Sequence, residues 1–435
     1  MCQNHHSFST SAEFSVQPPT TKRSAATSLS PHQWTNVARY LTAEEIASFR
    51  LGNKEITSDL SLTSHLQLRI DRAPFFSADN TFNISQARQW LTNRSRLLID
   101  DPNAKICPHR VAYLVDNGFL DTVISIQIFD CHIHHKIFAI LSHLPNLQSL
   151  RLASHASDQE EGVLEKLENI VASIGGITTL KQLDIEFDCL VHGSRLSFLR
   201  HVKGITHLRL RGFDLSEGMS SIGELQDLTS LHLCHGNFFS SPSNDVNEKD
   251  LINLMGLTKL QQVHLEGFDK LLDIGIKPFS TAFSSVKRLV LKHCQDMDKE
   301  CLPCIGQMQH LASLHFVNSA YEDVRIFDAE DLEQINSLST LKSLSLFYVL
   351  EDPSDLKALC DLSHLEVLSI AFHDDISEDG KDELCQNILH MFGSLRKLRI
   401  FSENEESMIC SYQRGGLTVE FSPFAFGDLV HGLES

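Results

Sequence analysis

A short leucine pattern that recurs along most of the chain constrains the fold more than any other feature of the sequence. The pattern L-x-x-L-x-x-L-x-L, with other apolar residues at some positions, occurs eleven times. Its seventh position falls on residues 126, 150, 183, 208, 231, 263, 289, 314, 344, 368 and 398, with a mean spacing of about 27 residues. Each copy can hold one short strand, a turn and a returning helix. One copy cannot bury its own leucines, so neighbouring copies must stack.

The pattern and its spacing resemble the leucine-rich repeat, whose units have roughly 20 to 29 residues. The resemblance implies an α/β fold: a solenoid with a parallel sheet on its concave side and helices on its convex side. Segment 286–306 resembles the cysteine-containing subclass of these repeats, with Cys294 in its expected turn, and segment 263–279 keeps the same spacing with Phe268 instead. This subclass is common in intracellular proteins.

Residues 29–60 carry the signals of three short helices. Ser30 and Thr42 each begin a capping box, and Pro31 lies at the first position of the first helix, where a missing N–H does no harm. Three short helices bury too little apolar surface to be stable alone. The sequence therefore predicts a small all-α module that needs a partner or the repeat array beside it.

This module resembles an F-box. The residues that match the family pattern are Leu29, Trp34, Val37, Tyr40, Leu41, Ile46, Phe49, Arg50, Leu51 and Lys54. Ser30, Gly52 and Ile56 depart from the pattern. The other interpretation of this stretch is a helical cap for the solenoid. The resemblance implies docking on the Skp-family adaptor of a cullin–RING (SCF-type) ubiquitin ligase. The adaptor-binding residues that it implies are Leu29, Pro31, Trp34, Val37, Leu41, Ile46, Phe49 and Leu51.

These features predict five segments along the chain. They are a disordered Ser/Thr/Pro-rich leader (1–28), the F-box-like module (29–60), a connecting region (61–119), a solenoid of about eleven repeats (120–416) and a C-terminal cap that begins with a last strand (417–435). Within the connecting region, we expect a strand at 65–70 and a helix over 85–98.

The concave face of the sheet is the expected binding surface. Positions six, eight and ten of each copy face it, because alternate residues of a strand point to opposite sides. Seven basic and three acidic residues occupy these positions, on a chain whose net charge is −19. His232 and His264 should be neighbours on adjacent strands, about 4.8 Å apart. The predicted target-binding residues are Arg209, Arg211, His232, His264, Arg288, Lys292 and His315.

Such a face is expected to be a partly basic, pH-sensitive groove for an acidic or phosphorylated protein segment. The other interpretation is that exposed sheet positions are simply polar. Under either interpretation, an extended concave surface is the part of a solenoid that binds partners.

The sequence contains few signs of catalysis or of a metal site. It contains no P-loop, no G-x-S-x-G elbow and no H-E-x-x-H motif. Cys301-x-x-Cys304 and the cluster at 131–135 contain metal-ligating residue types, but the repeat places the first on a helix and the second in a connecting loop. We therefore expect no catalytic residue, no cofactor and no metal. The net charge argues against nucleic acid, and the absence of a long apolar run argues against a membrane span.

The function expected from these features is that of a non-catalytic substrate receptor in an SCF-type ubiquitin ligase, which holds a target protein near the conjugating enzyme. Eleven scattered cysteines and the lack of an apolar secretory signal predict a cytoplasmic location. That location is a host cytosol if the leader directs export from a pathogen or symbiont. The alternative is a leucine-rich-repeat scaffold or inhibitor that binds a protein without an adaptor.

Overall fold

The computed structural model describes the repeat region. The residues that it describes are 68–69, 91, 96–100, 108–129, 135–154, 163–215, 217–235, 252–268, 280–294, 301–318, 327–350, 352–371, 378–402 and 418–423. All of them belong to one unit, Thr63–Ser435. The expected leader, the F-box-like module with its eight adaptor-binding residues, and residues 424–435 of the expected cap lie outside the described residues.

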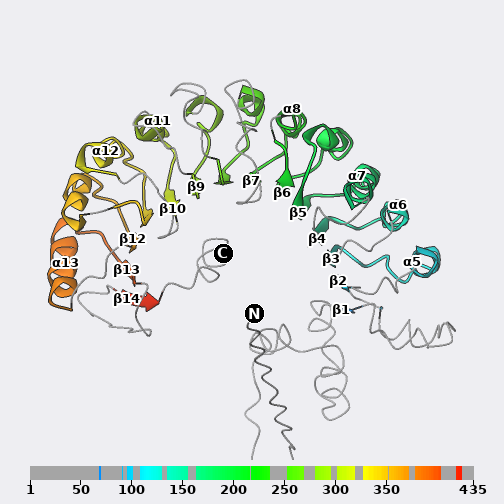
Figure 1. Cartoon of the computed structure of the whole chain (residues 1–435), viewed down its shortest axis with the longest axis horizontal. Coiled ribbons are helices and arrows are strands. Elements are labelled where there is room, and N and C mark those ends of the chain that lie inside the picture. Colours follow the sequence, from blue (N-terminus) through cyan, green and yellow to red (C-terminus); the bar gives the residue numbers. More distant parts are fainter. Residues whose placement is uncertain are drawn as a thin grey trace, which may run out of the picture. The chain divides into compact units, whose positions relative to one another are not determined.

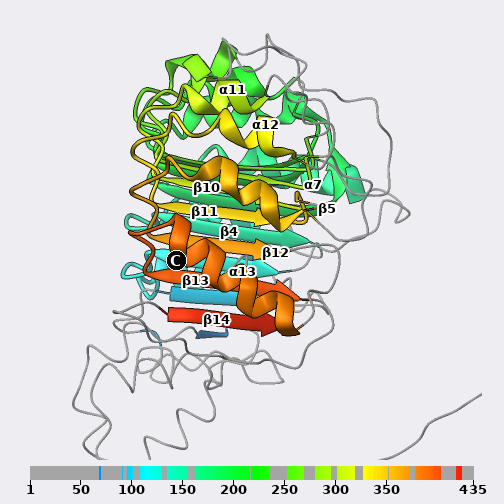
Figure 2. The ribbon, with the colours of Figure 1, turned by 90° about the vertical axis from the view of Figure 1, so that its left-hand side faces the viewer.

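Among the described residues, fourteen parallel strands form one sheet, and their order in the sheet is their order in the chain. They are β1 (Leu68–Arg69), β2 (Arg96–Asp100), β3 (Ser125–Phe129), β4 (Ser149–Ser154), β5 (Gln182–Val191), β6 (His207–Phe213), β7 (Ser230–His235), β8 (Gln262–Glu266), β9 (Arg288–Lys292), β10 (Ser313–Val317), β11 (Ser343–Phe347), β12 (Val367–Ala371), β13 (Lys397–Ser402) and β14 (Thr418–Pro423). Figure 1 shows the strands on the inner side of an arc, and Figure 2 shows them stacked edge to edge.

The register of the sheet follows the leucine repeat. The seventh position of every copy pairs with the seventh position of the next, from Ile126 beside Leu150 to Leu368 beside Leu398. The eleven strands from β3 to β13 therefore lie where the sequence pattern predicts them. A parallel sheet with alternating helical segments is the architecture of a leucine-rich repeat.

Helical segments lie between most consecutive strands of the described residues, on the outer side of the arc (Figure 1). The α-helices are α5 (Pro108–Asp116), α6 (Lys136–Leu141), α7 (Val163–Ile174), α8 (Met219–Ile222), α11 (Cys301–Gly306), α12 (Ala329–Glu333) and α13 (Glu378–Met391). The 3₁₀ helices are η3 (Gly193–His201), η4 (Asn253–Gly256) and η5 (Pro353–Leu359). Several of these segments are short: α8 and η4 have four residues each and α12 has five. No helix in the described part of the chain is long and apolar enough to cross a bilayer.

The recurring spacing of the leucines within each copy builds the core. In the copy that contains β7, Leu225, Leu228, Leu231 and Leu233 are all at most 1% exposed. Burial of one such side chain contributes about 2 kcal/mol, and the same layer recurs in each copy. Hydroxyl groups fix the turn before several strands: Thr229, for example, donates from Oγ1 to the carbonyl of Thr206, 2.9 Å away in the preceding copy.

The sheet begins earlier in the chain than the sequence analysis predicts. The strand expected at 65–70 is confirmed by β1, but β2 was not expected, and these two strands extend the sheet past β3. A helix was expected over 85–98; Leu91 is helical, but residues 96–98 belong to β2. The prediction was wrong there because this strand lacks the full leucine pattern, although Leu97 is buried like the seventh position of later copies.

One backbone position, four residues after the seventh position, is left-handed in several copies. Gly212, Gly267, His293 and Tyr348 occupy it, with φ of 80°, 75°, 51° and 55°. The register of β6 with β7 shifts at Gly212, so this glycine lies in a β-bulge. Cys294 follows His293, is 1% exposed, and its thiol lies 3.5 Å from the carbonyl of Lys292, in the turn where the sequence analysis expects it.

Candidate binding groove on the sheet

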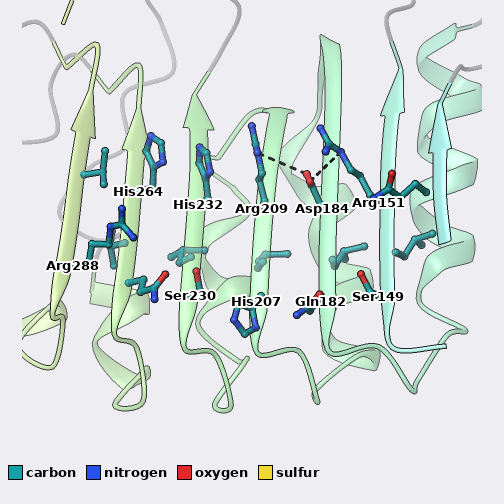
Figure 3. Close-up of a pocket in the computed structure, with 18 residues that line it drawn as sticks. Ser149, Arg151, Gln182, Asp184, His207, Arg209, Ser230, His232, His264 and Arg288 are labelled. Atoms are coloured by element: carbon teal, nitrogen blue, oxygen red, sulfur yellow. Dashed lines mark ion pairs between the residues drawn. The ribbon is translucent and has the colours of Figure 1, made fainter. Parts of the chain in front are cut away.

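A groove of about 530 Å³ runs across the inner face of the sheet, from β3 to β9 (Figure 3). The residues that line it come from consecutive strands. They are Gln127, Ser149, Leu150, Arg151, Gln182, Leu183, Asp184, His207, Leu208, Arg209, Ser230, Leu231, His232, Gln262, Val263, His264, Arg288 and Val290. These residues occupy positions six, seven and eight of their copies, so the pairing of the strands sets the order of side chains along the groove.

Two rows of side chains cross the strands in this groove (Figure 3). Position six supplies a row of mainly uncharged polar groups, which includes Ser149, Gln182 and Ser230. Position eight supplies a row of charged and imidazole groups, in which Arg209 lies beside His232 and His232 beside His264. Because both rows repeat at the strand spacing of about 4.8 Å, they form a regular series of hydrogen-bonding sites.

The arginines at one end of the groove share two carboxylates. Arg151 lies 3.3 Å from Asp184 and 3.4 Å from Glu186, Arg209 lies 3.9 Å from Asp184, and Arg211 lies 3.2 Å from Glu186. Burial raises the pKa of Asp184, and the charges of Arg209 and Arg151 oppose that rise. The result is a network in which each carboxylate holds guanidinium groups from neighbouring strands in place.

A second polar cluster lies on β7, β8 and β9. Lys292 Nζ donates to Glu266 Oε1 at 2.8 Å, and His232 Nε2 lies 3.7 Å from Glu266 Oε2. The rings of His232 and His264 are stacked, with centroids 3.7 Å apart and planes inclined by 14°. The prediction that these two histidines are neighbours is confirmed.

Burial and charge act in opposite directions on the groups of this second cluster. Burial alone would raise the pKa of Glu266, but hydrogen bonds and charge from His232 and Lys292 outweigh it and lower the pKa. Removal from water, followed by the charge of His232, lowers the pKa of His264 well below its usual range. Burial, with the nearby charge of Glu266, raises the pKa of the Cys234 thiol to about 12. The carboxylate is therefore ionised near neutral pH, the thiol is protonated, and the ring of His264 is neutral.

The seven predicted target-binding residues separate into two groups. Arg209, His232, His264 and Arg288 line the groove. The other three, Arg211, Lys292 and His315, are not among the residues that line it. Arg211 and Lys292 lie at position ten, beside Glu186 and Glu266, so counting charges from the sequence overstated the basic character of the face.

His315 differs most from its expected setting. It is only 2% exposed and hydrogen-bonds with Ser313 at 2.6 Å and Ser345 at 2.7 Å. Burial, with a smaller effect of the Arg288 charge, lowers its pKa to about 3. It therefore does not titrate near neutral pH, and the expected contribution of this histidine to a pH-sensitive surface was wrong.

Position ten also differs from the expectation that it faces solvent. On strands β10 to β13 this position carries Val317, Phe347, Ala371 and Phe401, and the first three form a buried cluster with Tyr348 against which Phe401 packs. The rings of Phe347 and Phe401 meet edge to face, with centroids 5.1 Å apart. Toward the end of the array, position ten therefore contributes to a buried apolar cluster instead of a polar surface.

Sequence reasoning overlooked the uncharged residues of the groove. Gln182, Ser230 and Gln262 line it, but the sequence analysis selected charged and imidazole side chains only. Their position in the repeat was the signal that identifies them, because all three are sixth residues of their copies. Amide and hydroxyl groups at this spacing can hydrogen-bond a chain laid across the strands.

The two metal-ligating motifs of the sequence are described only in part. Cys304 is buried on α11, whereas the side chain of Cys301 and residues 131–134 lie outside the described residues. Among the described residues, a different set gathers potential ligand atoms: His232, His264 and Glu266, within 4.8 Å of one another. No motif within a single copy contains this set, because its members lie on two different copies.

The described unit is thus a leucine-rich-repeat-like array. No protein-family model matches the sequence, and no curated protein matches it either. A solved leucine-rich-repeat protein of Leptospira interrogans is similar over 72% of this chain and 97% of its own, with 15% identity and a TM-score of 0.30. The TLR13–ssRNA13 complex is similar over 74% of this chain and 51% of its own, with 14% identity and a TM-score of 0.35.

Proposed function

We propose that this protein is a non-catalytic receptor that binds an extended segment of another protein in the groove of its sheet. The observation that carries this proposal is the groove itself, which crosses seven strands and presents polar groups at every strand. An extended polypeptide chain has hydrogen-bonding groups at regular intervals along its length. The side chains at positions six and eight also recur at regular intervals, so they can hydrogen-bond these groups.

The target segment is proposed to be acidic or phosphorylated. Three guanidinium groups line the groove, those of Arg151, Arg209 and Arg288, whereas Asp184 is the one carboxylate among the lining residues. Guanidinium groups form strong, directional hydrogen bonds with carboxylate and phosphate oxygens. The excess of guanidinium groups over carboxylates therefore favours a negatively charged partner, even though the whole chain carries a net charge of −19.

A library of displayed peptides, with and without phosphoserine, tests this proposal on the purified full-length chain. We expect selected peptides to be acidic or phosphorylated. Replacement Arg288→Ala should weaken their binding about tenfold, which is the usual effect of losing one charged hydrogen bond. Lys259→Ala is the matched control, because Lys259 is exposed and pairs with Asp227 away from the groove. Equal binding by the wild type and Arg288→Ala would contradict the proposal.

We propose further that the receptor serves a ubiquitin ligase, through residues 29–60. The support for this step is the F-box-like pattern, in particular Leu29, Trp34 and Phe49. In that role, the protein would raise the local concentration of target lysines near a charged conjugating enzyme and would do no covalent chemistry itself. The other role consistent with the groove is a scaffold or inhibitor that binds its target without an adaptor.

Co-expression with a Skp-family adaptor separates these two roles. We expect the wild type to co-purify with the adaptor and a Leu29→Ala/Trp34→Ala variant, still folded by circular dichroism, to lose it. A folded wild type that fails to bind the adaptor would leave the scaffold as the role of this protein. Peptide binding in the groove is unaffected by either result, so the two proposals are tested independently.

A further inference from the structure

Three side chains on neighbouring strands place their polar atoms around one point beside the groove. His232 on β7 is paired in the register with His264 on β8, and Glu266 lies two residues after His264, on the same face. One nitrogen of each ring and one carboxylate oxygen lie within 4.8 Å of one another. Two imidazoles and one carboxylate are a ligand set that binds zinc and similar transition metals.

The separations are close to those of a metal site. Zinc bonds of about 2.0–2.1 Å to nitrogen and oxygen place the ligand atoms of a tetrahedral site about 3.3 Å apart. His232 Nε2 already lies 3.7 Å from Glu266 Oε2. The stacked rings must turn about χ2 so that both lone pairs point to one ion, and this torsion is soft in histidine.

The neighbouring residues leave one polar atom of His264 and one of Glu266 available to bind a metal ion. His264 Nε2 is buried and has no hydrogen-bond partner among the described residues, which is a costly arrangement for a polar atom. Lys292 donates to Oε1 of Glu266 and leaves Oε2 on the side of His232, as outer hydrogen bonds orient carboxylate ligands in metal sites.

We propose that His232, His264 and Glu266 bind one transition-metal ion of the Zn²⁺ type, with water at the remaining coordination position. Calcium and magnesium do not suit this site, because they prefer sites made of oxygen ligands. The ammonium of Lys292 repels a dication nearby, so we expect binding in the micromolar range, weaker than in sites built from several thiolates.

Isothermal titration of the chelator-treated full-length chain with Zn²⁺ tests this site. The sequence contains 23 histidines and 11 cysteines, so the decisive quantity is the number of ions bound by matched variants. We expect His264→Gln and Glu266→Gln to bind one equivalent less than the wild type. His310→Gln, which changes an exposed histidine in a turn outside the cluster, should bind as many ions as the wild type.

Two results would overturn the proposal: a wild type that binds no Zn²⁺, or a His264→Gln variant that binds as many ions as the wild type. The His264 variant decides the matter if Glu266→Gln folds poorly, since the latter leaves Lys292 without its carboxylate. A Co²⁺ titration supplies a second readout, because visible absorption of bound Co²⁺ reports the ligand geometry. The spectrum of His264→Gln should lack the contribution of one four-coordinate ion that is present in the wild-type spectrum. The spectrum of His310→Gln should retain this contribution.

Discussion

Lys292 donates a 2.8 Å hydrogen bond to Glu266 on the neighbouring strand, and the two side chains are only 12% and 7% exposed. An ion pair in this setting differs from one at the surface, because neither charge can recover its hydration if the other is removed. The pair also joins β8 to β9 at the end of the groove.

Replacement of Lys292 by methionine should therefore destabilise the protein strongly. We expect the free energy of unfolding to fall by about 3 kcal/mol, since the carboxylate of Glu266 stays buried without its ammonium partner. Urea denaturation followed by circular dichroism measures the change. Lys259→Met is the control: Lys259 pairs with Asp227 at 2.6 Å, but both side chains are more than half exposed, so its loss should cost less than about 1 kcal/mol. Equal costs for the two variants would contradict this account.

His315 should make the stability of the protein depend on pH. An unfolded histidine titrates near pH 6.5, whereas the folded pKa of His315 is about 3. Between these values the unfolded chain binds more protons than the folded chain, so this residue lowers stability as pH falls below 6.5 and has no such effect above it. Denaturation at pH 7 and pH 5 should show a smaller loss in His315→Gln than in the wild type. The exposed His201→Gln should behave as the wild type, and an equal loss in His315→Gln would exclude His315 as the cause.

Gly212 should tolerate no side chain. Its φ of 80° is left-handed, and a Cβ there would overlap the carbonyl oxygen of Phe187. We expect Gly212→Ala to lower the free energy of unfolding by more than about 2 kcal/mol, through backbone strain and the clash between adjacent strands. Gly393→Ala is the matched control, because a Cβ at that position meets no atom within 4 Å. Thermal unfolding of the two variants provides the comparison, and similar midpoints would show that the bulge at Gly212 can relax.

Phe347 should be a large contributor to the last part of the array. Its side chain is fully buried and packs edge to face on Phe401, 5.1 Å away. Truncation to alanine removes this contact and leaves a cavity, so we expect a loss of about 3–5 kcal/mol. Met255→Ala serves as a surface control, since Met255 is 39% exposed, and should cost less than about 0.5 kcal/mol. A loss below 1 kcal/mol in Phe347→Ala would mean that position ten is not part of the core there.

The sequence predicts the strands and their register well, because both depend on one contact that recurs in every copy. The apolar residue at the seventh position of each copy pairs with the apolar residue at the seventh position of the next, so the spacing of the pattern gives the register from Ile126 to Leu398. Strand β2 was not predicted, because the residues around Leu97 lack that pattern. Here the pairing with β3, a contact distant in sequence, determines the strand.

The position of the groove was predictable from the sequence, but the exposure and pairing of its side chains were not. Alternation along the strands places Arg209 and His264 on the inner face, which is where the structure has them. Whether a group on that face is exposed, paired or buried depends on neighbours from other copies. His315 lies between two serines, and Glu266 between Lys292 and His232, and no pattern within a single copy contains these relationships.

Because the strands lie in the sheet in their chain order, the number of strands between two side chains sets the distance between them. Arg151 on β4 and Arg288 on β9 are separated by five strand-to-strand steps, or about 24 Å, which an extended chain of about seven residues spans. Removing one complete copy between them would shorten that distance by one step of about 4.8 Å and leave every remaining strand with a neighbour of the same design. The distance between Arg151 and Arg288 can therefore change by whole strand steps when a copy is gained or lost, while the side chains at each end stay the same.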